Sequence, residues 1–142
     1  MRRSRSLTSL IVAVALAACA EQPANELAGR WEVQQIAGAS LGEGVDIWLE
    51  FDASAENVRG FTGCNEFTTT ATVFGTNLSF ARVAEEAGEC PTPAAATDES
   101  RLLIVMPAIQ RYIRRGDSLE LLQAPSGSET LLRLRRVETA AE

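Results

Sequence analysis

The sequence contains neither histidine nor lysine, and all 13 of its basic residues are arginines. Without an imidazole, the chain cannot form a Ser-His or Cys-His nucleophile pair, an imidazole general base or a histidine metal site. These absences exclude most familiar enzyme mechanisms. We therefore expect a protein that is not an enzyme and that uses no cofactor and no metal.

The sequence also lacks the composition that is typical of a disordered chain. Disordered chains combine few apolar residues with a high net charge, whereas these 142 residues are 46% hydrophobic and carry a formal charge of −6. A chain of this length corresponds to one globular domain.

The N-terminal apolar run is too short for a transmembrane anchor. It extends from Leu7 to Ala18 behind three arginines and has roughly half of the about 20 apolar residues that a spanning helix needs. A basic start and a short apolar run are typical of a secretory signal. Residues 16–19, Leu-Ala-Ala-Cys, match the bacterial lipobox, where a signal peptidase cuts before a cysteine that receives lipid. An ordinary secretory signal is the alternative, because residues 15–17 form an A-x-A cleavage site.

Lipidation at Cys19 predicts how the chain is divided and where it resides. We expect a signal peptide at 1–18, a lipidated tether at 19–26, a folded domain at 27–137 and a C-terminal tail at 138–142. Cleavage leaves 10 arginines and 19 acids, a charge of −9, which argues against a nucleic-acid partner. Acyl chains on Cys19 would anchor the domain to a membrane. Ala20 replaces the Asp that commonly signals inner-membrane retention, so we expect the outer membrane, with the domain facing the periplasm.

Cysteine is scarce, and its number fits an oxidising compartment. Of three cysteines, assigning Cys19 to lipid leaves Cys64 and Cys90 as an even pair, which predicts a disulfide. The bridge would close a loop of about 27 residues, worth roughly 3 to 4 kcal/mol in the chain-entropy model. A metal site or catalytic thiol is the alternative, but CxxC spacing and histidine are both absent.

Short alternating stretches predict β-strands through most of the body. In the clearest one, Ile47, Leu49 and Phe51 share a face, as in a half-buried antiparallel strand. Comparable patterns predict strands at 31–36 (with a bulge), 58–61, 67–73, 78–80, 111–114, 118–122 and 130–137.

One stretch has helical rather than alternating spacing. Thr97 to Ser100 offers an N-cap and early acids, and the apolar residues that follow recur at helical intervals. This predicts one helix from about Asp98 to Met106, preceded by a long loop over 81–96 that carries Cys90. The predicted fold class is α+β: a small antiparallel β-sheet or partly open barrel of about 7–8 short strands, with one helix packed against it.

Three blocks of sequence occur in a characteristic order: Leu-Ala-Gly-Arg-Trp at 27–31, Trp-Leu-Glu-Phe-Asp at 48–52, and Gly-Phe-Thr-Gly-Cys-Asn-Glu-Phe at 60–67. Together with later landmarks such as Cys90-Pro91, they resemble the META domain family over about residues 27 to 136. The resemblance implies a small antiparallel β fold with one helix packed across it. It also implies an envelope lipoprotein, sometimes linked to heat stress or antibiotic tolerance, with no established catalytic site.

The 60–67 block is the most specific part of this resemblance. Gly60 and Gly63 permit positive φ or close backbone approach, and Asn65 can bond its neighbouring backbone in an Asx-turn. We interpret Gly60, Gly63, Asn65 and Phe67 as a structural motif. A binding role for Asn65 is the alternative.

Clustered charges give the candidate binding surface. Arg111, Arg114 and Arg115 lie close together in the sequence, and Arg133, Arg135 and Arg136 crowd the last strand. If they converge on one sheet face, they would suit phosphate or lipid head groups, and the candidate surface consists of Arg111, Arg114, Arg115, Arg133 and Arg135. Alternatively, arginine stems cover the sheet and their guanidinium groups pair with acids. The adjacent acids Glu85 and Glu86 lie in the predicted loop, which does not provide the fixed carboxyl separation of about 5 to 9 Å that glycan hydrolysis needs.

Three function classes remain. The leading hypothesis is a non-catalytic envelope module that binds an unidentified envelope protein or lipid, or supports envelope integrity under stress, with the membrane reached through the lipid anchor. The alternative is a carrier or secretion pilot that holds a lipid or apolar peptide in a groove between helix and sheet. The third is a glycan hydrolase, which would require a cleft with facing carboxylates.

Overall fold

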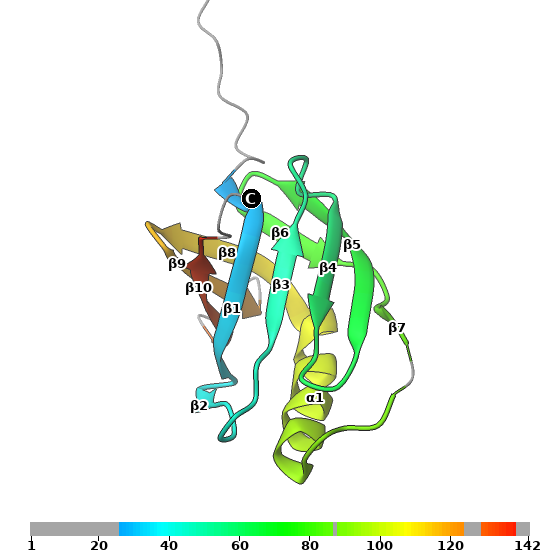
Figure 1. Cartoon of the computed structure of the whole chain (residues 1–142). Helices are drawn as coiled ribbons and strands as arrows, with labels where there is room; N and C mark the ends of the chain where they lie inside the picture. Colours follow the sequence, from blue (N-terminus) through cyan, green and yellow to red (C-terminus); the bar gives the residue numbers. More distant parts are fainter. Residues whose placement is uncertain (1–25, 87, 124–128, 139–142) are drawn as a thin grey trace, which may run out of the picture.

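The computed structural model describes residues 26–86, 88–123 and 129–138 (Figure 1). It consists of ten strands, one α-helix and one 3₁₀ turn: β1 Gly29–Ile36, β2 Ala39–Ser40, β3 Trp48–Phe51, β4 Asn57–Phe61, β5 Glu66–Phe74, β6 Asn77–Phe80, β7 Ala84–Glu85, α1 Pro93–Val105, the 3₁₀ turn Met106–Ala108, β8 Ile109–Arg115, β9 Ser118–Gln123 and β10 Thr130–Val137. Within these residues, no helix has the length and apolar character needed to cross a membrane.

Eight strands form a closed antiparallel barrel. They pair in the order β1, β3, β4, β5, β6, β8, β9, β10, and β10 pairs back with β1, while β2 and β7 are short additions. The predicted α+β class with an open or partly open sheet is therefore wrong: the protein is mostly β, with one helix packed outside the barrel. Alternation marks each strand but does not specify that strands from opposite ends of the chain pair, and this pairing removes the sheet's free edges.

The individual strand predictions are largely confirmed. Ile47, Leu49 and Phe51 are all buried, as their alternation predicts. The bulge predicted in the first strand is also present, since the β1–β10 register shifts between Val33 and Gln35. The short strands β2 and β7 were not predicted.

The helix begins one and a half turns earlier than predicted. Its N-cap is Thr92, whose hydroxyl accepts a hydrogen bond from the Ala95 N–H at 3.1 Å. Pro93 at the first helical position has a backbone already suited to the helix. The sequence pattern places Pro93 in the predicted loop over 81–96, so this part of the loop prediction is wrong. Asp98, predicted to start the helix, is instead buried in its second turn and accepts a hydrogen bond from the Gly42 N–H at 2.7 Å.

The antiparallel topology gives the barrel two different ends. At the terminal end, β1 starts and β10 finishes, beside the turns at residues 52–56, 75–76 and 116–117. The helix end carries the β4–β5 turn, the β7 segment beside β5, and α1, which extends below the strands in Figure 1. There Leu102 and Met106 are buried in the same core as Ile109.

Candidate functional site

A hollow lined by arginines lies on the outer face of the barrel, over β1, β8, β9 and β10. We call it the arginine hollow. Its volume is about 600 Å³, and its lining residues come from five strands and one turn: Gln34, Gln35, Ser40, Arg115, Asp117, Ser118, Arg133, Leu134 and Arg135.

Strand register brings three of these arginines together. Ser118 on β9 pairs with Arg115 on one side and with Arg135 on the other. These two arginines therefore lie two strands apart, about 10 Å, while Arg133 and Arg135 are about 7 Å apart along β10. Three guanidinium groups thus surround one hollow.

The bulge in β1 adds amide groups to the same place. Gln35 pairs with Arg133, and the register shift leaves Gln34 as an additional, exposed residue. Bulges commonly change the direction in which side chains point. Both glutamine side chains line the arginine hollow, where each offers a hydrogen-bond donor and an acceptor.

Three arginines and one acid, Asp117, line the arginine hollow. Arg133 Nε lies 3.2 Å from Glu120 Oε1, a surface ion pair in which Arg133 is exposed and Glu120 is half-buried, and such pairs contribute little. Within the described part of the chain, Arg115 and Arg135 form no ion pair. The arrangement can therefore receive an anionic group such as a phosphate or a carboxylate.

The other two predicted arginines lie elsewhere. Arg114 lies at the terminal end, where its Nε donates to the Gly116 carbonyl at 3.0 Å and its guanidinium carbon is 5.9 Å from the centre of the Trp31 ring. Arg111 is exposed and pairs with Asn77 beside the β5–β6 turn. The five arginines therefore do not form one surface.

Arg136, which the candidate surface did not include, closes the terminal end. Its guanidinium carbon lies 4.4 Å from the centre of the Trp31 ring, and its terminal nitrogens donate to the carbonyls of Ala28 and Glu26. Burial and the charge of Arg114 lower the pKa of Arg136. Its contacts attach residues 26–28 to the barrel.

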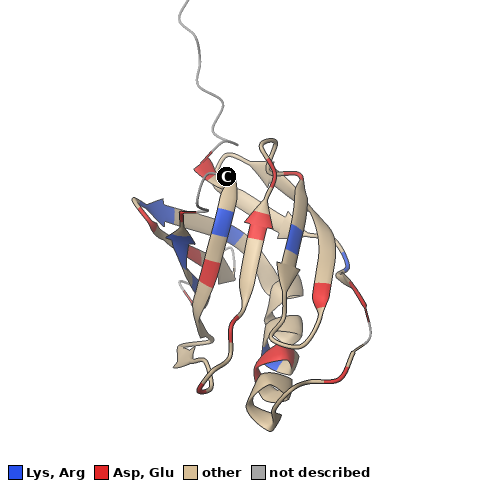
Figure 2. Cartoon of the chain, in the orientation of Figure 1, with Lys and Arg blue, Asp and Glu red and all other residues tan. Residues whose placement is uncertain are grey.

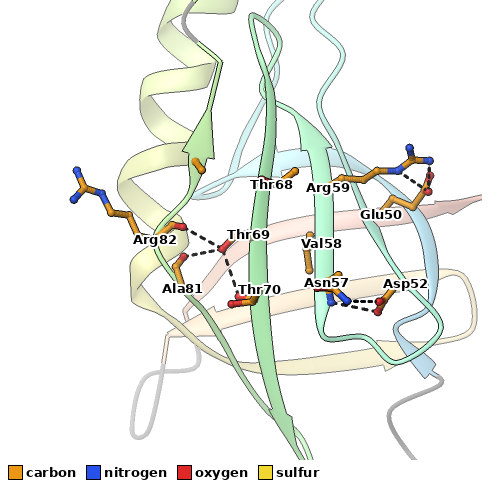
Figure 3. A pocket seen from close by; sticks show the side chains of 11 residues that line it. Glu50, Asp52, Asn57, Val58, Arg59, Thr68, Thr69, Thr70, Ala81 and Arg82 are labelled. Carbon is orange, nitrogen blue, oxygen red and sulfur yellow. Dashed lines mark hydrogen bonds and ion pairs between the residues drawn. The ribbon is translucent and has the colours of Figure 1, made fainter.

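A second hollow, of about 480 Å³, lies over β3, β4, β5 and the segment that follows β6. Figure 3 shows Arg59 directed towards Glu50 and Asn57 directed towards Asp52. Most of its charged groups are therefore already paired. Two carboxylates line it, which makes it the place to look for acid-base chemistry.

Both carboxyl groups have lowered pKa values. Burial raises the pKa of Glu50, but hydrogen bonds from Arg59 and Arg30 outweigh it and hold this pKa below its usual value. Hydrogen bonds from Asn57 and Ser54 lower the pKa of Asp52 to about 2. A general acid at neutral pH needs a raised pKa, so the pair does not fit a glycoside hydrolase.

The predicted disulfide between Cys64 and Cys90 is present. It joins the β4–β5 turn to the segment before α1, and Glu99 Oε2 lies 3.4 Å from Cys90 Sγ. These two sulfurs and Glu99 are close enough to suggest a metal site, but sulfurs bonded to each other offer no thiolate ligand.

Asn65 has a different contact from the one predicted. The Thr62 hydroxyl, not Asn65, shapes the turn by accepting the N–H groups of Cys64 and Asn65. The buried Asn65 amide instead donates to Glu99 Oε1 on the helix at 3.0 Å. Sequence reasoning missed this contact because the two residues are 34 positions apart.

The other motif residues have packing roles. A Cβ on Gly60 would lie 2.5 Å from the ring of Phe67, and also 2.5 Å from a backbone carbonyl oxygen, so only glycine fits there. Gly63 has a φ of +95° in the turn. Cys19, the predicted signal peptide and the predicted tether up to residue 25 lie outside the described residues.

Comparisons with known proteins agree with this fold. A model of the META domain family matches residues 24–138. The NMR structure of a protein from Burkholderia xenovorans has a TM-score of 0.64 and 20% identity, covering 92% of this chain and 100% of that one. A second NMR structure has a TM-score of 0.58 and 14% identity, covering 78% and 90% respectively. At these identities the likeness concerns the fold alone, and no curated protein matches.

Proposed function

The chain belongs to the META domain family, and from that premise we propose that it is a non-catalytic binding module of the bacterial envelope. The observation that carries this proposal is the arginine hollow, where Arg115, Arg133 and Arg135 surround a space of about 600 Å³. Its ligand would be an anionic group, phosphate or carboxylate, on an envelope lipid or protein. Such binding would support envelope integrity under stress.

The proposed location rests on the N-terminal sequence. Basic residues, a short apolar run and Leu-Ala-Ala-Cys favour cleavage before Cys19 and lipid attachment there. A disulfide suits an exported protein. Ala20 favours sorting to the outer membrane, where the barrel would face the periplasm.

The chemistry of the side chains supports a role without catalysis. The sequence has no histidine, and the carboxyl groups of Glu50 and Asp52 have lowered pKa values that do not suit a general acid. Burial and the charge of Glu99 raise the pKa of Glu85, but Glu85 is exposed on the short strand β7 and lines neither hollow.

The carrier alternative has less support. It requires a groove between the helix and the sheet, yet Leu102 and Met106 fill that junction and are almost completely buried. The two hollows described above lie on strand surfaces instead.

A charge-matched pair of variants tests the proposal. Arg133→Ala with Arg135→Ala should leave the fold intact and weaken binding of pyrophosphate or an acidic peptide at least about tenfold, as expected when charged hydrogen bonds are lost. Arg59→Ala with Arg82→Ala removes the same charge from the other hollow and should leave binding unchanged. Calorimetric titration measures both.

Two outcomes would contradict the proposal. One is equal binding by the two double variants, which would mean that the arginine hollow is not the site. The other is turnover of peptidoglycan or peptide substrates that a single carboxylate substitution abolishes, because this would identify an enzyme.

A further inference from the structure

One large apolar side chain is exposed at the tip of a hairpin. Phe74 is the last residue of β5, pairs with Asn77 across the β5–β6 turn, and is 81% exposed. A single exposed apolar residue is ordinary, so its meaning depends on how it is held and where it lies.

The hairpin tip is fixed to the barrel. The Tyr112 hydroxyl donates to the Gly75 carbonyl at 3.1 Å, and the Tyr112 N–H donates to the Thr76 carbonyl at 3.0 Å. Tyr112 itself is buried. Both bonds anchor the two residues that follow Phe74, so the barrel maintains the exposure of its ring.

This hairpin lies at the end of the barrel where the chain enters. In the antiparallel register, the β5–β6 turn opens at the terminal end, the same end at which β1 begins (Figure 1). Arg136 binds the Glu26 carbonyl there. Seven residue steps separate Glu26 from Cys19, a span of at most about 25 Å. A lipid on Cys19 would keep this end close to a bilayer.

Charge differs between the two ends of the barrel (Figure 2). Among the described residues, the helix end sets Arg82, Arg101 and the nearby Arg133 against many acids: Glu43, Asp46, Glu66, Glu85, Glu86, Glu89, Asp98, Glu99 and Glu129. At the terminal end, acids and arginines are nearly balanced, and exposed Arg111 lies beside the hairpin. An anionic bilayer surface would therefore repel the helix end and favour approach by the terminal end.

We propose that the terminal end docks on the bilayer, with the Phe74 ring inserted at the boundary between head groups and acyl chains and Arg111 against the head groups. The occupant is a lipid surface rather than a protein. This inference rests on the lipid anchor of the proposed function. A phenylalanine ring is stabilised at this depth because its apolar surface leaves water, while the polar backbone of the hairpin stays at the level of the head groups.

Ile104 provides a matched control. It is 75% exposed, similar in size and apolar, but it lies on α1 at the helix end. The photoreactive residue p-benzoylphenylalanine, placed at 74 or at 104 in the full chain, should be irradiated in isolated envelopes. We expect phospholipid adducts at 74 to exceed those at 104 by about tenfold.

Tryptophan quenching gives a second measurement. Lipidated Phe74→Trp and Ile104→Trp proteins would be reconstituted in vesicles of phosphatidylethanolamine and phosphatidylglycerol containing brominated lipid. The native tryptophans contribute the same background to both proteins. Quenching should be stronger for Phe74→Trp.

The outcomes separate docking from anchoring. Equal lipid contact at 74 and 104, or adducts at 74 that are mainly with protein, would overturn the docking. The lipid anchor would still stand in that case if the mass of the protein shows an acylated Cys19. A mature protein whose mass shows no acyl addition would overturn the anchor, and docking with it.

Discussion

The two ends of the barrel differ in what their side chains contact. At the helix end, a disulfide, a buried amide and buried leucine connect segments that are distant in sequence. At the terminal end, the turns at 52–57 and 114–116 carry local hydrogen bonds and Phe74 is exposed, while long-range hydrogen bonds from Arg136 and Tyr112 hold residues 26–28 and the β5–β6 turn to the barrel. The two ends therefore differ in how they are held: a covalent bond and fully buried side chains cover the helix end, whereas the terminal end and the adjacent strands keep surfaces available for interaction.

The largest expected effect comes from Leu102, which is completely buried where α1 meets the barrel. Leu102→Ala should reduce the free energy of unfolding by about 3 to 5 kcal/mol, because it removes buried methyl groups and leaves a cavity. Urea unfolding followed by tryptophan fluorescence measures this. Phe74→Ala at the terminal end is the control and should change stability by less than about 0.5 kcal/mol. A similar loss in both variants would remove the distinction between the ends.

Removing the disulfide should have the next largest effect. Replacing Cys64 and Cys90 together with Ala should reduce the free energy of unfolding by about 3.5 kcal/mol, because the unfolded chain regains the freedom of a long loop. Reducing the wild-type protein with a thiol should produce the same loss in the same urea titration. A loss below about 1 kcal/mol would show that the helix end does not depend on the bridge.

Two asparagines, one at each end of the barrel, allow the stabilising effect of the same side chain to be compared between the two ends. The buried Asn65 amide donates to Glu99, whereas the exposed Asn57 amide donates to Asp52. Asn65→Ala should cost about 1.5 to 3 kcal/mol, since a buried hydrogen bond to a charged group is lost. Asn57→Ala should cost less than about 0.5 kcal/mol because water replaces its bond. Thermal unfolding of both variants would contradict this ranking if Asn57→Ala cost more.

Local patterns predicted the strands well, because alternation with period two depends only on neighbouring residues. Barrel closure could not be predicted from them, since the β1–β10 register joins residues such as Trp31 and Arg136 from opposite ends of the chain. The helix start was missed because Pro93 looked like a loop residue, although proline is favoured at the first helical position.

The candidate site was predictable in part. Arg133 and Arg135 are two residues apart on one strand and so share a face, as expected. Adjacent residues on a strand point to opposite faces, and this rule already separates Arg114 from Arg115. The glutamines of the arginine hollow and the Asn65–Glu99 contact depend on strand pairing and helix placement, which no local pattern contains.

The smallest predicted effect concerns two carboxyl groups whose pKa values shift in opposite directions. At the terminal end, hydrogen bonds from Asn57 and Ser54 lower the pKa of Asp52 to about 2. The unfolded chain therefore binds this proton more readily, so the stabilisation by Asp52 is complete above its ordinary pKa of 3.8 and is lost as pH falls towards 2. At the helix end, burial, the charge of Glu99 and a hydrogen bond with it raise the pKa of Glu85 above its ordinary value of 4.5. Here the folded protein binds the proton more readily, and stability decreases as pH rises from 4.5 through the raised pKa.

Single substitutions should reveal the two signs. Glu85→Gln should be more stable than the wild type at pH 7, because it removes a charge facing Glu99, and this advantage should disappear as pH falls below about 4.5. Asp52→Asn should be less stable than the wild type at pH 7, and this deficit should shrink as pH approaches about 2. Urea unfolding at intervals between pH 2 and pH 7 measures both differences. Both carboxyl groups are accessible enough for solvent to weaken the effects. The test is therefore the sign of the change with pH in the stability difference between each variant and the wild type. Slopes of the same sign would mean that the two ends do not differ electrostatically in the way that their contacts indicate.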